Sequence, residues 1–372
     1  TQELFRQMIR EFAEKEVKPL AAEIDELEKF PAETVEKMAK LGIFGIPVPT
    51  QYGGAGGDNL MYSIAVEELS RACATTGVVV SAHTSLCMAP IMEHGTEEQK
   101  MKYLPKLASG EWIGAFGLTE PNAGTDAAGQ QTTAVLDGDE WVLNGNKIFI
   151  TNAGPAHVYI VIAMTDKSMK TKGISAFIVE KGTPGFEIGK KELKMGIRGS
   201  ATAELIFNNC RIPKDNLLGK IGGGFPIAMK TLDGGRIGIA AQALGIAQAA
   251  LDETVKYTKE RKQFGKAIGQ FQNTQFQMAD LKTRVEAARL LVRSAAFKKD
   301  SGVPYSADAA MAKLFAAETA MEVTTKAVQF HGGYGYTREY PVERMMRDAK
   351  ITEIYEGTSE VQRMVISANL YK

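Results

Sequence analysis

The hydrophobic pattern of this chain changes its period twice, and that change constrains the fold more than any other feature. In residues 1–112 apolar side chains recur at helical spacing, as on one face of an α-helix. Residues 113–215 carry short runs of β-branched and aromatic side chains between turn-forming residues, a pattern typical of strands. Helical spacing returns in residues 216–372. We therefore expect a mainly α, α+β chain with an N-terminal helical domain, a central antiparallel β domain and a C-terminal four-helix bundle.

In the first region, individual residues predict where helices begin and end. Pro31 suits the first turn of a helix and Gly42 suits its end. The apolar face of that helix would include Val35, Met38 and Leu41.

Capping signals mark two further helices in this region. Asp58 precedes an apolar helical pattern and is a plausible N-cap, because its carboxylate can accept from free backbone N–H groups. Thr96 and Gln99 stand at capping-box spacing before another helix.

The central region is predicted to form a small antiparallel sheet or barrel. Strands are expected at 141–143, 158–164, 174–179 and 205–207, with turns at 137–139, 144–145 and 183–185. No helix-sized segment alternates with these strands, so a doubly wound nucleotide-binding sheet is not expected.

The third region is predicted to contain long helices near 225–260, 272–299 and 306–330. A buried stripe is expected on the second of them, at Val285, Ala288, Leu291 and Val292. Several helices of this length fit a bundle.

The charge balance bears on possible partners. Lys plus Arg and Asp plus Glu number 44 each, which gives a net charge of zero. Proteins that bind nucleic acids or anionic membranes usually carry a basic excess, so neither partner is expected. The cysteines lie far apart and the histidines lack metal-ligand spacing, which argues for a reducing compartment and against a metal site. No apolar stretch approaches the roughly 20 residues that span a bilayer.

The segments Phe116–Asp126 and Lys147–Asn152 each allow two interpretations. The first is dense in hydroxyls, small residues and backbone donors, which lets a loop bond to the edge of a flat heteroaromatic ligand. The same composition is common in tight turns. The second places an aromatic and a hydroxyl side chain at a strand end, where they would line a ligand ring or belong to a half-buried strand.

Two basic segments also leave alternatives open. In Thr231–Arg236, the arginine near a helix start would meet an anionic or polar substrate group, or Asp233 would cap the helix and leave Arg236 solvated. In Arg261–Gly265, followed by Gln272, the arginine suits a pyrophosphate clamp. A positive charge at a helix C-terminus is the alternative.

The last two segments are Gln329–Tyr336 and Ile354–Gln362. The glycines of the first let backbone N–H groups approach a phosphate, although an inter-helix turn would look the same. In the second, Glu356 follows Ile354 and Tyr355, and a carboxylate in apolar surroundings becomes a stronger base as its pKa rises. The alternative is a solvated glutamate in a turn.

All six segments occur together, in an order and spacing that resemble the acyl-CoA dehydrogenase family over essentially the whole chain. Bacterial butyryl-CoA (short-chain) members look most similar, in segments such as Gly117–Asp126 and Thr231–Ala240. The resemblance implies the three-domain fold expected above, with domains at 1–112, 113–215 and 216–372.

The resemblance implies a role for particular residues. Glu356 matches the catalytic base. Substrate-facing positions are matched by Thr125, Asp233, Gly234, Gly235, Arg236 and Gly357. FAD-binding positions are matched by Phe116, Leu118, Thr119, Gly124, Thr125, Phe149, Ile150, Thr151, Arg261, Gln272, Gln329, Phe330, His331, Gly332, Gly333, Thr358, Ser359 and Glu360, of which Arg261, Gln272 and 329–333 would reach the FAD of a neighbouring subunit.

The implied activity is FAD-dependent α,β-dehydrogenation of a short-chain acyl-CoA, or its reverse, in the bacterial cytoplasm. Electron-transferring flavoprotein is the implied electron partner and a homotetramer the implied assembly. Long-chain and isovaleryl relatives place the base near the position of Gly235, and nitroalkane oxidases carry Asp at the base position, so Glu356 favours the commoner dehydrogenase arrangement. Alternatives are an acyl-CoA oxidase that uses O₂, which is usually longer, and a non-catalytic acyl-CoA-binding protein.

Overall fold

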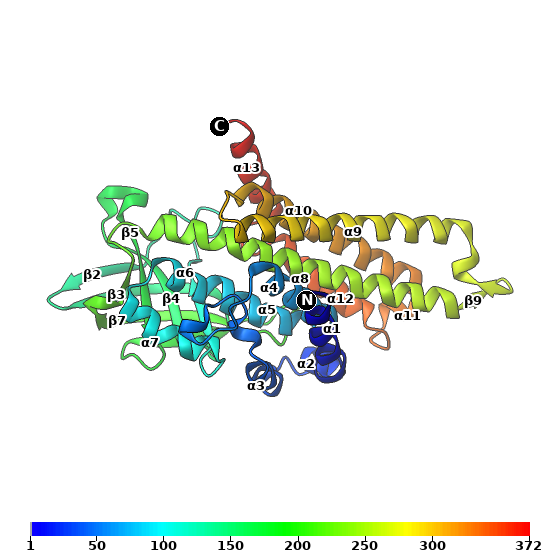
Figure 1. The fold of residues 1–372 in the computed structure, drawn as a ribbon, viewed down its shortest axis with the longest axis horizontal. Helices are drawn as coiled ribbons and strands as arrows, with labels where there is room; N and C mark the ends of the chain where they lie inside the picture. Colours follow the sequence, from blue (N-terminus) through cyan, green and yellow to red (C-terminus); the bar gives the residue numbers. More distant parts are fainter. Residues whose placement is uncertain (1) are drawn as a thin grey trace.

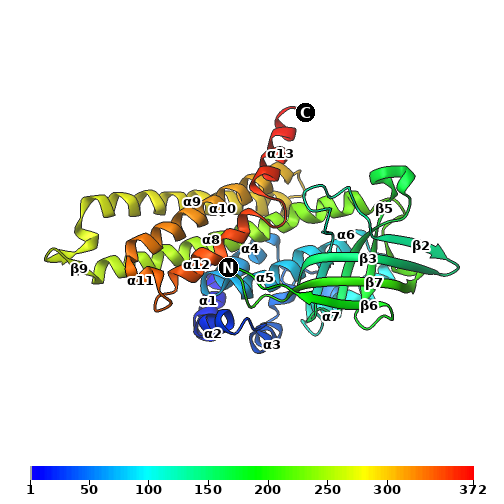
Figure 2. The same cartoon turned by 180° about the vertical axis from the view of Figure 1, so that it is seen from behind.

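The computed structural model describes residues 2–372 and forms an elongated molecule with a β-sheet at one end and long helices at the other (Figure 1). The N-terminal helices lie along the side of this body, which Figure 2 shows from behind. They are α1 (Gln2–Phe12), α2 (Ala21–Glu26), α3 (Ala32–Lys40), α4 (Asn59–Ala72), α5 (Ala74–Ser81), α6 (Ala89–His94) and α7 (Glu97–Ala108), with a π-helical stretch η5 (Ala82–Met88) between α5 and α6.

The predicted helix ends of this region are largely confirmed. The Asp58 carboxylate accepts from the Met61 N–H at 2.7 Å, and Thr96 and Gln99 form a capping box. Gly42 follows α3 at a φ of 72°, which is the left-handed conformation that ends helices. Leu41 was wrongly predicted to be buried: it is 47% exposed, because α3 ends at Lys40 and the chain turns away before the next helical position.

One continuous helical run, Ala74–His94, is long and apolar enough to cross a membrane by length and composition, contrary to the expectation from sequence. Scattered Ser, Thr and His residues conceal this in the sequence. The run is 89% buried within the molecule, which is what a core helix of a globular protein looks like.

The central strands form a mixed sheet rather than the purely antiparallel one predicted. The strands are β1 (Gly114–Gly117), β2 (Thr133–Asp137), β3 (Glu140–Thr151), β4 (Val158–Met164), β5 (Ile174–Glu180), β6 (Phe186–Lys191), β7 (Thr202–Pro213) and β8 (Leu217–Leu218). Their order is β6-β7-β3-β2-β4-β5-β8, with β1 beside β4. Both β1 and β2 run parallel to β4, because they reach it through long connections rather than hairpins.

Asn144–Gly145 was predicted as a turn but lies inside β3. The register against β7 shifts between Leu143 and Gly145, so the dipeptide forms a β-bulge. Gly145 has a φ of 141°, and a Cβ there would lie 2.4 Å from the Thr132 hydroxyl oxygen. Asn-Gly pairs mark both turns and bulges, and only tertiary packing distinguishes them.

The three long helices of the bundle lie where they were predicted. The C-terminal helices are α8 (Gly224–Glu260), α9 (Gln272–Asp300), α10 (Ser306–His331), α11 (Gly333–Tyr336), α12 (Val342–Lys350) and α13 (Ser359–Leu370). A short hairpin, β9 (Lys262–Gln263) and β10 (Lys266–Ala267), joins α8 to α9 at the far end of the molecule (Figure 1). Val285, Ala288 and Val292 are fully buried, as expected of the stripe.

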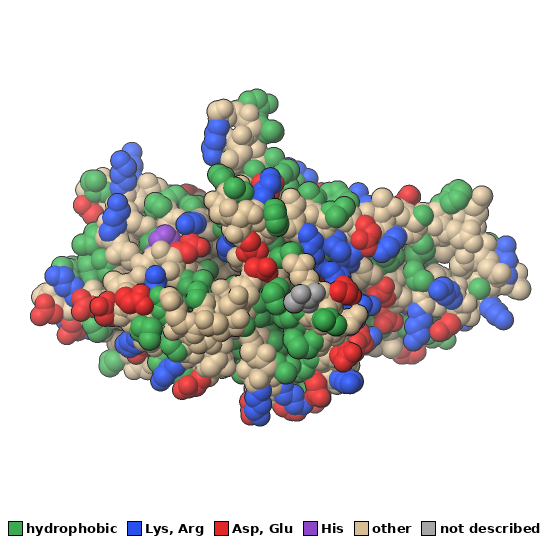
Figure 3. Space-filling view, viewed as in Figure 1, with side chains coloured by type: hydrophobic (Ala, Val, Ile, Leu, Met, Phe, Trp, Pro, Cys, Tyr) green, Lys and Arg blue, Asp and Glu red, His purple; other side chains and the backbone are tan. Residues whose placement is uncertain are grey.

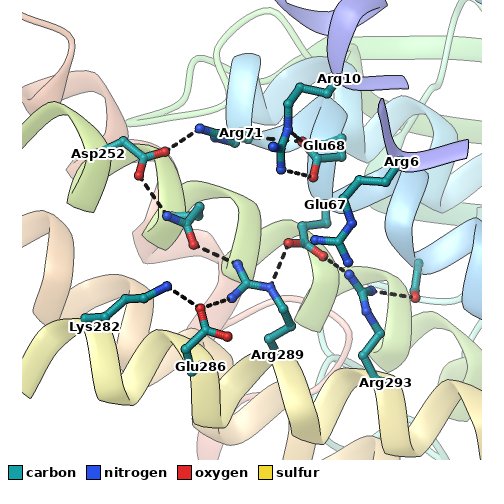
Figure 4. A network of polar contacts seen from close by, with 12 residues as sticks. Arg6, Arg10, Glu67, Glu68, Arg71, Asp252, Lys282, Glu286, Arg289 and Arg293 are labelled. Atoms are coloured by element: carbon teal, nitrogen blue, oxygen red, sulfur yellow. Dashed lines mark hydrogen bonds and ion pairs between the residues drawn. The ribbon is translucent and has the colours of Figure 1, made fainter. Parts of the chain in front are cut away.

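Buried charges join the N-terminal helices to the bundle (Figure 4). Glu67 of α4 accepts from Arg289 and Arg293 of α9, and Glu68 accepts from Arg10 of α1 at 2.9 Å. By contrast, the surface in Figure 3 carries both charge signs interspersed, in keeping with the zero net charge.

Candidate active site

A cavity of about 500 Å³ lies where the sheet meets α8, η5 and the segment before α13. It brings together most of the predicted residues from the first, second and last motifs. Its lining comprises Ala82, Leu86, Phe116, Leu118, Thr119, Gly124, Thr125, Ala127, Phe149, Ile150, Thr151, Met229, Leu232, Arg236, Ile351, Ile354, Tyr355, Glu356, Gly357, Thr358 and Val361.

The sheet side of the cavity consists of the end of β1, the following loop and the end of β3. Phe149 adopts a φ of 57° and is 60% exposed, so it departs from the regular strand alternation. With it, Ile150 and Thr151 face the cavity. The segment is thus both a strand end and part of a concave site.

A buried ion pair fixes the loop that follows β1. Lys147, fully buried in β3, donates to the Glu120 carboxylate at 2.7 Å and to the Leu118 carbonyl at 3.0 Å. Glu120 in turn accepts from the backbone N–H groups of Gln131 and Thr132. Burial lowers the Lys147 pKa to about 8, although the neighbouring Glu120 carboxylate acts to raise it. These bonds therefore fix the backbone conformation of residues 118–132, which contain almost no regular secondary structure.

Glu356 points into the cavity from a turn between Ile351–Glu353 and α13. Its Oε2 atom is buried and has no hydrogen-bond partner within residues 2–372. Burial raises the Glu356 pKa to about 7, while Lys313 and then Arg236 oppose the rise. The alternative of a solvated turn glutamate is therefore wrong.

Gly235 of α8 makes room for this carboxylate. A Cβ at Gly235 would lie 2.5 Å from Glu356 Oε2 and 2.8 Å from Leu86 Cδ2. The absence of a side chain thus allows the glutamate to approach the helix.

Asp233 and Arg236 form a pair deep within α8. The helix begins at Gly224, so Asp233 does not cap it. The Arg236 guanidinium is 5% exposed, rather than solvated, and donates to Asp233 Oδ1 at 2.8 Å. Burial lowers the Arg236 pKa and raises that of Asp233. Arg236 lines the Glu356 cavity, whereas Asp233 lines a neighbouring cavity of about 650 Å³ with Lys230, Lys299 and Tyr305.

The remaining predicted residues do not line the Glu356 cavity. Arg261 and Phe330–Gly333 border a separate cavity of about 520 Å³, at the end of the bundle near β9 and α11 (Figure 1). Gln272 begins α9, and Gln329 lies in the last turns of α10. Ser359 and Glu360 begin α13 behind Thr358, and Gly234 faces the Lys299 amino group.

Sequence reasoning missed two buried polar residues behind Glu356. Lys313 of α10 and Gln362 of α13 are 1% and 0% exposed. Lys313 stands among the fully buried Ala309, Ala312 and Ala316. A lone lysine among alanines at helical spacing was the signal that could have identified it.

Comparisons with known proteins place the chain in a family. Models for the N-terminal, middle and C-terminal domains of acyl-CoA dehydrogenase match residues 1–111, 115–210 and 222–371. The short-chain specific acyl-CoA dehydrogenase of Clostridium acetobutylicum is 65% identical, over 100% of this chain and 98% of the relative. The chain therefore belongs to the acyl-CoA dehydrogenase family, and the three-part fold expected from sequence is confirmed.

Solved structures agree with this assignment. Butyryl-CoA dehydrogenase from Megasphaera elsdenii superimposes with a TM-score of 0.98 at 54% identity, over 100% of this chain and 98% of that one. A second chain comes from structural work on the electron transferring flavoprotein of Acidaminococcus fermentans and flavin-based electron bifurcation. It superimposes with a TM-score of 0.99 at 59% identity, over 100% of this chain and 98% of that one.

Proposed function

We propose that Glu356 removes the α-proton of a short-chain acyl-CoA bound in the 500 Å³ cavity, as the base of an acyl-CoA dehydrogenase. The enzyme is of the short-chain, butyryl-CoA type, by its similarity to the relatives named above. One observation carries the assignment of the base: an unpartnered carboxylate oxygen buried in a mostly apolar cavity. A carboxylate whose pKa is raised to about 7 is suited to general base catalysis near neutral pH.

The family uses FAD, and the cavity residues fit the flavin ring. The volume lies in the range of small-molecule sites. Phe149 and Ile150 offer apolar surface, and Thr119, Thr125, Thr151 and Thr358 offer hydroxyls around it. When bound, the flavin supplies an acceptor for the two electrons and hydrogen that leave the β-carbon as hydride.

The chain's own residues would prepare the substrate for proton loss. The acyl chain would displace water from beside Leu86 and Tyr355, which strengthens Glu356 as a base. No acceptor within residues 2–372 takes the Glu356 N–H, so this group is available to the thioester oxygen as charge develops there. The α-proton ends on the Glu356 carboxylate, and the product is a trans-2-enoyl-CoA.

The polar part of the substrate has a separate place to lie. The Asp233–Arg236 pair lies between the two cavities: Asp233 lines the 650 Å³ cavity and Arg236 lines the first. Lys230, Lys299 and Ser306 offer donors there, which suit an amide-rich, phosphorylated chain such as coenzyme A. Lys299 is partly buried, and burial lowers its pKa.

FAD would be shared between copies of the chain in a homotetramer. Arg261, Gln272 and Gln329–Gly333 cluster at the end of the bundle away from Glu356. This separation supports the idea that they contact the diphosphate and adenosine of a cofactor whose ring lies in another copy. Ser359 and Glu360 begin α13 near the first cavity and would make a second FAD contact. Electron-transferring flavoprotein is the proposed electron partner, supported by the similarity to the Acidaminococcus fermentans chain. Buried, unpaired Cys73, Cys87 and Cys210 support a bacterial cytoplasmic location.

The test is reduction of enzyme-bound FAD by butyryl-CoA under anaerobic conditions. Glu356→Gln should bind FAD normally, but butyryl-CoA should reduce its flavin at least about 10³-fold more slowly, because the amide cannot accept the α-proton. Bleaching at the normal rate would remove Glu356 from its proposed role. Rapid O₂ consumption with butyryl-CoA would identify an oxidase, and a protein that takes up no FAD would identify a non-catalytic binder.

A further inference from the structure

The turn that carries Glu356 has a backbone conformation that needs external support. Glu356 adopts a φ of 56° and Gly357 a φ of 94°. A left-handed conformation is unfavourable for a residue with a side chain, because its Cβ lies too close to the following carbonyl oxygen. Such residues persist where the surrounding structure holds them in place.

Two buried side chains hold this turn from behind, both through the Gly357 carbonyl. The Lys313 ammonium donates to that oxygen, and Gln362 Nε2 donates to it at 2.8 Å. Gln362 also reaches the Glu356 carbonyl at 3.4 Å. Lys313 comes from α10 and Gln362 from α13, so two separate helices fix one carbonyl.

The buried position of Lys313 is energetically unfavourable for a charged side chain. The residue is 1% exposed, and among the described residues 2–372 its ammonium group bonds a backbone carbonyl rather than a carboxylate. Burying an ammonium group without a direct ionic partner is strongly unfavourable, because the charge loses its hydration. A methionine would fill the same space among the alanines without that cost, so packing alone does not account for the lysine.

The charges around the pair come from several elements. Glu356 faces Lys313 of α10, Arg236 of α8, Tyr62 of α4 and the adjacent Tyr355. Lys313 faces Glu356, Arg236 and Glu353. Of the two cations, Lys313 has the larger effect on Glu356, and burial lowers the Lys313 pKa to about 7.

We propose that Lys313 is a positioning residue for the catalytic glutamate, with Gln362 as its uncharged counterpart. Lys313 holds the Glu356–Gly357 turn through the Gly357 carbonyl and places a positive charge behind the carboxylate. Gln362 supports the same carbonyl without adding charge. This inference rests on the proposed role of Glu356 as base.

The test compares pH profiles of flavin reduction by butyryl-CoA in FAD-loaded variants, measured anaerobically by stopped flow. Lys313→Met should move the midpoint for Glu356 ionisation upward by about one pH unit. Below the midpoint the rate should then fall about tenfold. Well above it the rate should level off below the wild-type rate, because the bond to the Gly357 carbonyl is lost at every pH. Gln362→Leu should slow the reaction at every pH without moving the midpoint.

Lys313→Arg is the matched control, because arginine stays charged at every accessible pH. Its midpoint should lie at or below that of the wild type. If Lys313→Met gives no FAD-loaded protein, the arginine variant alone decides, and a midpoint above that of the wild type contradicts the proposal.

An infrared titration without substrate separates this inference from the proposed function. The carbonyl band of protonated Glu356, identified by its absence in Glu356→Gln, should persist to higher pH in Lys313→Met. An unchanged band and an unchanged rate profile would overturn the role of Lys313 while leaving Glu356 as base. Normal flavin reduction by Glu356→Gln would overturn the proposed function itself.

Discussion

At the scale of single residues, Gly235 matters because it has no side chain: the Glu356 carboxylate occupies the space that a side chain would fill. In Gly235→Ala the new Cβ would lie 2.5 Å from Glu356 Oε2, with Leu86 closing the other side at 2.8 Å. The carboxylate must then move, and a displacement of about 1 Å costs on the order of 10²-fold in rate. We expect this loss in stopped-flow flavin reduction with the FAD content unchanged. A variant as fast as the wild type would show that the carboxylate works from another position.

Burial of Glu356 also makes stability depend on pH. The pKa of Glu356 is raised from 4.5 to about 7 in the folded chain. Below pH 4.5 the carboxyl is protonated in both the folded and the unfolded chain, so its ionisation does not affect stability. As pH rises toward and through 7, the unfolded chain loses this proton more readily, and the folded state becomes less stable. Glu356→Gln removes the ionisation. The difference in unfolding free energy between Glu356→Gln and the wild type should therefore increase, in favour of the variant, by on the order of 2 kcal/mol between pH 5 and pH 8. Urea unfolding of the two proteins at both pH values measures the difference, and a constant offset would contradict it.

At the scale of elements, the loop 118–132 depends on one buried ion pair. Lys147→Met leaves the Glu120 carboxylate buried without its cation, which costs roughly 3–5 kcal/mol. We expect a lower thermal midpoint and weaker FAD binding, because the loop lines the cavity. Adding Glu120→Gln should restore part of both, since it removes the unpaired buried charge and its amide oxygen can still accept from one of the Gln131 and Thr132 N–H groups. Lys190→Met, at an exposed site, is the control; equal effects there would exclude a specific role for the pair.

Elements were predictable from sequence where local pattern decides them. The long helices α8, α9 and α10 carry enough apolar positions to define their extent, and the caps at Asp58 and Thr96 act within one turn. Asn144–Gly145 was mispredicted because its bulge is fixed by Thr132, which is distant in sequence. The tertiary support of Glu356 by Lys313 and Gln362 was missed for the same reason, because three separate segments meet there.

At the scale of the whole molecule, the two sets of predicted FAD contacts lie in two separate places, one where the sheet meets the bundle and one at the far end of the bundle. The Glu356 cavity adjoins the sheet. Arg261 and His331 line a second cavity near the β9–β10 hairpin, whose place in the fold Figure 1 shows. We have proposed that each FAD is held by two copies of the chain, so FAD retention should depend on assembly. Phe264 on that hairpin is 95% exposed, and in the proposed homotetramer we expect a second copy to cover it.

Phe264→Lys should therefore weaken assembly and FAD binding together. A lysine at a buried apolar contact must be desolvated, so we expect smaller species by sedimentation and FAD affinity lower by at least about tenfold. Val135→Lys, 60% exposed on β2 at the sheet end, changes a surface apolar residue away from the hairpin and should alter neither. A Phe264→Lys chain that sediments as a monomer yet holds FAD as tightly as the wild type would mean that one chain suffices, and that Arg261 and His331 serve some other ligand.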